Sequence, residues 1–156
     1  MLTPELTPQQ AADLDRRRAE FAPFFADVMP VLVDFCTALE LPNPHEVLND
    51  PEPFVDPIAS WLLAQDLPTA THDDRIWLFC RVGYFIGEVF VRRYSGCWFV
   101  DDLPKPNWFS HFVVGQFPRF PNARVAPMQM AIDLIDATGD LCAYLADASD
   151  AIEASS

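Results

Sequence analysis

The sequence has no cluster of metal-binding or paired redox residues. Its three histidines are scattered, and its four cysteines lie far apart without a C-x-x-C pair: Cys36, Cys80, Cys97 and Cys142. A structural zinc site needs such ligands close together, so we expect neither a metal nor another cofactor. The N-terminal stretch MLTPELTPQQ also lacks the basic and apolar regions of a secretory signal. These absences favour a reduced, cytoplasmic protein.

Motifs of the common catalytic and nucleotide-binding sites are missing as well. There is no G-x-S-x-G, Walker A, G-x-G-x-x-G, H-E-x-x-H or EF-hand loop. The glycines within residues 83–88 could suggest a phosphate cradle, but they fall inside a predicted helix, where backbone N–H groups are already bonded. The sequence leaves enzymatic activity open and favours a non-enzymatic role.

Lysine and arginine are absent from residues 19–74 and from residues 125–156. The whole chain has 10 Lys and Arg against 23 Asp and Glu, a formal net charge of −13. Residues 75–124 hold seven bases against three acids, so we expect part of the acidity to be neutralised between segments. The remaining acidic surface disfavours nucleic acid and anionic membranes and favours a protein partner with a basic surface. Acidity that only maintains solubility would give the same composition.

What the sequence does contain is one long, nearly all-apolar helix, predicted over residues 72–94. Thr71 and Asp74 have the spacing of a capping box at its start. Within its apolar run the only charges are Arg81 and Glu88, which is typical of a helix surrounded by other elements. Because this run is shorter than the about 20 apolar residues that cross a bilayer, we expect no membrane span.

Glycines lie within this helix and at its end. Gly83 and Gly87 lie four residues apart, and each costs a helix roughly 0.8–1 kcal/mol relative to Ala. Two such positions indicate that another element packs closely against the helix. Ser95-Gly96 is predicted to end it with a left-handed residue.

The fold class expected from these patterns is α+β: about five to six helices around the central helix 72–94, with a small two- to three-stranded antiparallel β element at 97–125. We expect one globular domain over residues 1–156, with frayed ends at 1–6 and 154–156. The other elements are given in chain order. The first half has a helix at 7–22 that Pro23 breaks or kinks, a helix at 24–41 with a bend or a restart at Pro30, a proline-rich loop at 42–57 that can hold one helical turn at 45–48, and a helix that restarts at Pro57. The second half has strands at 97–102 and 108–117, a loop at 117–127 that can hold a third short strand at 124–125, and helices from Pro127 to Thr138 and over 140–154.

Three polar side chains share one stripe of the central helix, Arg81, Tyr84 and Glu88, and Arg92 continues the same stripe at i+11. One interpretation is an internal polar seam in which neighbours satisfy the charges, since an unpaired buried charge is costly. The other is a pocket around these residues, roofed by Trp98 and Trp108, that binds or transforms a ligand.

The run Tyr84-Phe-Ile-Gly87-Glu88, followed by Arg92-Arg93, Gly96 and Trp98, carries a resemblance to a known pattern. It resembles the Y-x-x-G-E…G-x-W segment of small, largely uncharacterised bacterial proteins, some of which are similar to immunity proteins of polymorphic toxin systems. The resemblance covers about fifteen residues, and Ser95-Gly96-Cys97 stands where that pattern tends to have two glycines before the Trp. It implies a small stand-alone bacterial domain without known catalysis, whose shared Gly87, Glu88 and Trp98 serve the fold.

Three functional hypotheses follow. The leading one is a non-enzymatic, acidic protein-binding module of the immunity or inhibitor type, which covers a basic site on a partner protein. Its first candidate contacts are acids of the proline-rich loop and its flanks: Asp50, Glu52, Asp56, Asp73 and Asp74. The alternative is a small enzyme or ligand-binding protein that uses the pocket named above. The third is a homodimer that associates through exposed aromatic residues of the β element.

Overall fold

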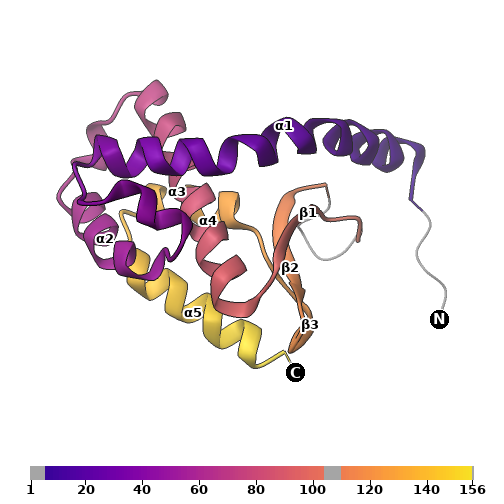
Figure 1. Ribbon diagram of the computed structural model, residues 1–156. Coiled ribbons are helices and arrows are strands. Elements are labelled where there is room, and N and C mark those ends of the chain that lie inside the picture. The colour runs from indigo at the N-terminus through magenta and orange to yellow at the C-terminus, as the bar shows by residue number, and fades with distance from the viewer. Residues whose placement is uncertain (1–5, 104–109, 156) are drawn as a thin grey trace.

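The protein has a mostly helical α+β fold. The computed structural model describes residues 6–103 and 110–155, in which five α-helices pack with one three-stranded antiparallel sheet. Figure 1 shows helix α1 lying across the top of the molecule, with its N-terminal part over the sheet. The predicted fold class is confirmed.

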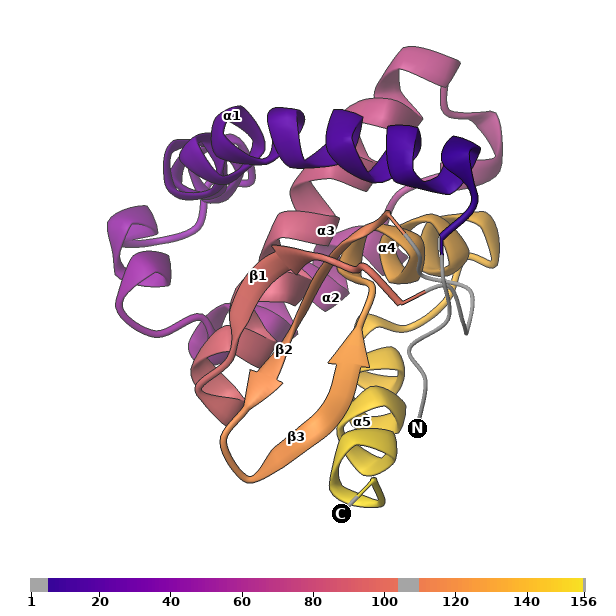
Figure 2. The same cartoon turned by 90° about the vertical axis from the view of Figure 1, so that its right-hand side faces the viewer.

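Helix α1, Pro8–Ala38, begins at the predicted capping box. The Thr7 hydroxyl accepts a hydrogen bond from the Gln10 amide at 3.1 Å, and the Gln10 side chain accepts one from the Thr7 amide at 2.9 Å. The helix continues through both Pro23 and Pro30, so it neither breaks at the first proline nor restarts at the second. Figures 1 and 2 show that it bends along its length, which is the other outcome predicted for prolines inside a helix.

Packing on both sides of Pro23 explains why α1 does not end there. The rings of Phe21 and Phe24 lie 6.0 and 4.1 Å from the ring of Phe112 in the sheet. One turn later, Val28 and Leu32 are fully buried in the core. Contacts before and after the proline hold both halves in helical register, which offsets the local loss of a backbone hydrogen bond.

The proline-rich segment forms two short 3-10 turns, Pro44–Leu48 and Glu52–Phe54, which places a helical turn where one was predicted. Helix α2, Val55–Leu63, begins two residues before the predicted restart at Pro57. A third 3-10 turn, Leu67–Thr69, leads into the central helix.

Helix α3, His72–Tyr94, is the predicted central helix. The Thr71 hydroxyl accepts a hydrogen bond from the Asp74 amide at 3.1 Å. The left-handed residue at its end is Ser95, with φ of 58°, and not Gly96. Helices α1 and α4 and strands β1 and β2 all contact α3, and Figure 2 shows it behind the sheet with α1 crossing above. Helix α3 therefore forms the centre of the core.

The sheet has the strand order β1-β2-β3, with β1 at Cys97–Val100, β2 at Phe112–Phe117 and β3 at Phe120–Val125. The predicted pairing of the first two strands is confirmed. The third strand allowed at 124–125 is present but longer, because the chain turns tightly at residues 118–119 and continues as β3, so the predicted loop is reduced to this turn. Pro121 is compatible with a strand at this position because β3 is an edge strand.

Two helices complete the fold. Helix α4, Pro127–Asp136, begins at the predicted proline, and helix α5, Leu141–Glu153, follows an N-cap at Asp140. Helix α4 packs on α3 at Gly83, where a Cβ atom would lie 3.2 Å from the Met128 Cα atom. The close approach predicted from the helix glycines is thus confirmed at Gly83.

Candidate functional site

Tyr84, from the predicted polar stripe, joins two helices. Its side chain is 7% exposed, and its hydroxyl donates a hydrogen bond to the Phe24 carbonyl at 3.1 Å. Burial, together with the nearby charges of Asp27 and Cys80 and against that of Arg81, raises the pKa of this phenol to about 12. Tyr84 therefore stays neutral and acts as a fixed link between α3 and α1.

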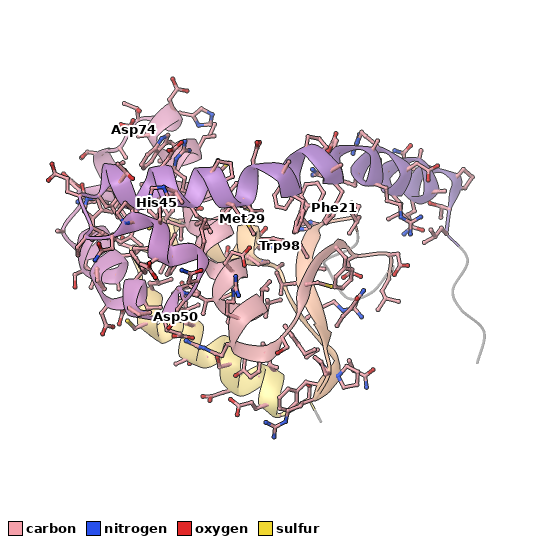
Figure 3. The ribbon with its side chains drawn as sticks, viewed as in Figure 1. Phe21, Met29, His45, Asp50, Asp74 and Trp98 are labelled. Carbon is pink, nitrogen blue, oxygen red and sulfur yellow. The ribbon has the colours of Figure 1, made fainter. Side chains whose placement is uncertain are left out.

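Trp98 packs into the same aromatic group. Its ring lies 5.2 Å from that of Phe24 and 6.3 Å from that of Tyr84, and it rests against the bare backbone of Gly87. Figure 3 shows Trp98 beneath α1. Trp98 is 5% exposed, so it belongs to the core of the described residues. Trp108, the other predicted roof residue, lies outside the residues that the structure describes.

Glu88 is half-buried and lies one helical turn after Tyr84 on α3. Burial raises the pKa of its carboxyl group, an effect that the positive charge of Arg92 partly offsets. Arg92 itself donates to the Leu48 carbonyl at 2.6 Å. The guanidinium of Arg81 lies elsewhere, 4.3 Å above the Trp77 ring. The predicted pocket residues are therefore divided between aromatic packing and separate polar contacts.

The five predicted contact acids do not form one patch. Figure 3 shows Asp74 above α1 and Asp50 well below it. Glu52 is neutralised by Arg93, whose guanidinium donates two hydrogen bonds of 2.8 Å to its carboxylate. Asp56 accepts a hydrogen bond from the Cys142 thiol at 3.3 Å, and Asp73 is exposed in the first turn of α3.

Ion pairs neutralise only part of the acidity. In the described residues six arginines pair with carboxylates, whereas the sequence has 23 Asp and Glu. One pair is buried: Asp101 is 1% exposed and accepts from the Arg124 guanidinium at 2.6 Å. The predicted neutralisation between segments is confirmed by Arg93 with Glu52 and by Arg75 with Asp136. Most other carboxylates of the described residues form no ion pair.

Two of these free carboxylates, those of Glu46 and Asp50, line a pocket of about 400 Å³, which we call the loop pocket. The Glu46 carboxylate accepts from the Asn49 side chain at 3.2 Å, and the Asp50 carboxylate accepts from the Glu52 amide at 3.1 Å. The other lining side chains are mainly apolar: Leu41, Pro42, Asn43, Pro53, Phe54 and Pro57.

Sequence reasoning identified Asp50 of the loop pocket but missed Glu46. The signal that could have located it is the turn at Pro44–Leu48, which carries Glu46 and fixes its side chain beside the prolines. The loop pocket therefore combines an apolar surface rich in proline with two carboxylates that are positioned by hydrogen bonds. This arrangement suits the side chain of a long basic residue.

Helix α1 also presents apolar surface. Phe25 and Met29 are 49% and 51% exposed, and none of the large exposed hydrophobic side chains of the described residues lies in a strand. By length and composition α1 could cross a membrane, because one 18-residue window has a mean hydropathy of 1.5. This window is 22% buried within the protein. The core helix of a soluble protein can meet the same criterion of length and composition. The expectations of no membrane and of a homodimer stay predictions.

Metal ligands do not gather in the described part of the chain, where no group of three or more His, Cys, Asp or Glu side chains could hold an ion. Comparison with known proteins gives no further guide: no family model, no curated protein and no solved structure matches the chain. A functional proposal therefore depends on the geometry of the pockets and on the charge.

Proposed function

We propose that this protein is a non-enzymatic binding module that recognises a basic surface on a partner protein, in the manner of an immunity or inhibitor protein. The loop pocket is the observation that carries the proposal. Its carboxylates, from Glu46 and Asp50, have no arginine or lysine partner among the described residues. The resemblance of the Tyr84–Trp98 run to immunity-like proteins supports the same class.

The pocket matches a lysine or arginine side chain in both of its parts. The aliphatic stem of such a side chain packs on apolar surface while its charged head stays at a polar rim. Here Pro42, Pro53 and Phe54 supply the surface, and Glu46 and Asp50 supply the rim. The net charge of −13 adds long-range attraction that raises the rate of encounter with a basic partner.

A salt-dependent capture experiment tests this function. The tagged protein is incubated with lysate of its own cells and with the purified products of adjacent genes, and bound protein is released by increasing salt. We expect one stoichiometric partner that dissociates at high salt, because exposed charge pairs are screened. For a toxic adjacent product, co-expression with this protein should relieve the toxicity.

Paired variants locate the contact. Glu46→Gln with Asp50→Asn should weaken binding to the captured partner about tenfold or more, since charge-assisted contacts are lost. The control is Asp147→Asn with Asp150→Asn on α5, which changes the net charge equally on exposed residues. Equal weakening by both variants would show a non-specific charge effect and exclude the loop pocket. Failure to capture any partner before salt is added would refute the proposed function itself.

A further inference from the structure

A second pocket, which we call the tryptophan pocket, opens between the end of α2 and the start of α3. Its volume is about 400 Å³, and its lining includes Trp61, Asp66, Asp74 and Trp77. Figure 3 shows Asp74 far from Asp50 of the loop pocket. The tryptophan pocket is therefore a separate site.

Both indoles are positioned by one buried ring. Phe35 of α1 has no exposed surface, and its ring meets Trp61 at 6.3 Å and 89° and Trp77 at 5.7 Å and 71°. Both tryptophans remain half-buried, so each contributes surface to the pocket. The two rings are held in place before any ligand arrives.

Trp77 already contacts a cation within the protein. The Arg81 guanidinium lies 4.3 Å from the Trp77 ring centroid, and its Nη1 atom donates to the Trp77 carbonyl at 3.2 Å. Arg81 does not line the pocket. A tryptophan ring attracts cations through its negative face, and this contact shows that Trp77 is used in that way.

The tryptophan pocket is lined by negative charge and by no basic side chain of the described residues. Asp66 and Asp74 are exposed, and no arginine or lysine of the described residues lines the pocket beside them. Arg75 lies next to the pocket, since its guanidinium donates to the carbonyl of the lining residue Leu67 at 3.0 Å, but its charge is paired with Asp136. Two indoles and two carboxylates thus line a pocket that no basic side chain of the described residues lines, although Arg81 lies against the Trp77 ring.

We propose that the tryptophan pocket binds an organic cation of the methylated ammonium class. Indole rings and nearby carboxylates are the groups that recognise quaternary ammonium ions, and the volume suits a small ligand. A hydrated metal ion fits poorly beside Trp61 and Trp77 because hard cations require several oxygen ligands. The cation is supplied either by a free choline-like molecule or by a trimethylated lysine side chain of a protein. The proposal uses no residue of the loop pocket.

Titration of the full chain tests the proposal. Choline, tetramethylammonium and a trimethyl-lysine peptide are titrated separately, with the unmodified lysine peptide and 3,3-dimethylbutanol, the uncharged analogue of choline, as controls. Binding is followed by calorimetry and by the NMR signals of the indole N–H groups. We expect saturable 1:1 binding of a methylated cation, shifts at Trp61 and Trp77, and an unchanged signal at Trp98. The methylated probe should bind at least about tenfold more tightly than its control.

The source of the cation follows from the comparison of probes. Binding of choline supports a free ligand, whereas binding of the methylated peptide alone supports a protein side chain. Asp66→Asn with Asp74→Asn should weaken binding about tenfold, while Asp147→Asn with Asp150→Asn should leave it unchanged. Absence of saturable binding by every cation, or equal binding of choline and 3,3-dimethylbutanol, would overturn the proposal. Neither result would affect the partner binding assigned to the loop pocket.

Discussion

Replacing Gly87 by alanine tests the contact around which the aromatic core is assembled. The added Cβ atom would lie 1.9 Å from Cζ2 and 2.4 Å from Cη2 of Trp98, whereas ordinary contact begins at 3.4 Å, so the indole would have to move by about 1.5 Å. Phe24 and Tyr84 stand 5.2 and 6.3 Å from the same ring, which leaves it little freedom to move. A rigid ring cannot yield in the way that a flexible side chain can.

The expected change in the free energy of unfolding on Gly87→Ala is the difference between two effects. Alanine is better than glycine in a helix by about 1 kcal/mol, while overpacking a well-filled core costs about 1–3 kcal/mol and occasionally more. At this distance the clash lies at the upper end, so Gly87→Ala should destabilise the protein by about 2 kcal/mol. For a chain of this size the melting temperature should fall by about 4–8 °C.

Urea unfolding followed by far-ultraviolet circular dichroism measures this difference. The matched control is Gly83→Ala, whose Cβ atom would meet the flexible Sδ atom of Met128 at 2.3 Å and its Cα atom at 3.2 Å. Because Sδ can rotate away and the backbone contact is only slightly tight, this variant should be less destabilising than Gly87→Ala by at least about 1 kcal/mol. In a Trp98→Leu background, Gly87→Ala should become neutral or stabilising, because the ring that it meets is gone. An equal effect in both backgrounds, or a Gly87→Ala protein more stable than the original, would refute this packing argument.

Two further predictions concern charge. Asp101→Ala should lower the free energy of unfolding by about 1.5–3 kcal/mol, because it removes a buried carboxylate that accepts from both Arg124 and the Leu103 amide. Glu52→Ala should cost about 1 kcal/mol or less, because the Glu52 carboxylate is exposed; similar losses in urea unfolding would contradict the assigned difference in burial of the two carboxylates. Glu88→Gln should raise the melting temperature at neutral pH, because burial raises the pKa of Glu88 in the folded state and ionisation then opposes folding. Since both states carry a neutral carboxyl below the unfolded pKa, this advantage should vanish in acid; a constant difference across the pH range would contradict it.

Helix α3 could be predicted closely because its signals are local. The cap at Thr71, the sparse charges Arg81 and Glu88, and the paired glycines all lie within the helix or next to it. The contacts of Gly83 and Gly87 confirm that these glycines allow other groups to approach, although the sequence did not identify Met128 and Trp98 as those groups. Identifying them requires the path of the whole chain.

The features that sequence reasoning missed depend on distant contacts. Helix α1 continues through Pro23 because Phe112 lies beneath both halves, and β3 forms because β2 offers it an edge. The tryptophan pocket likewise needs Phe35 to hold Trp61 and Trp77, which the composition alone cannot distinguish from core residues. Local propensity is overruled in each case by tertiary packing.

The ion pairs divide the charged side chains into those that serve the fold and those that line the two pockets. Arg93 and Arg75 reach across the chain to Glu52 and Asp136, so the bases of the central segment serve the fold. Among the described residues, the carboxylates of Glu46, Asp50 and Asp74 form no ion pair, and each lines a pocket that has apolar walls. The arginines that stabilise the fold and the acids that line the pockets can therefore be replaced independently of one another by mutation.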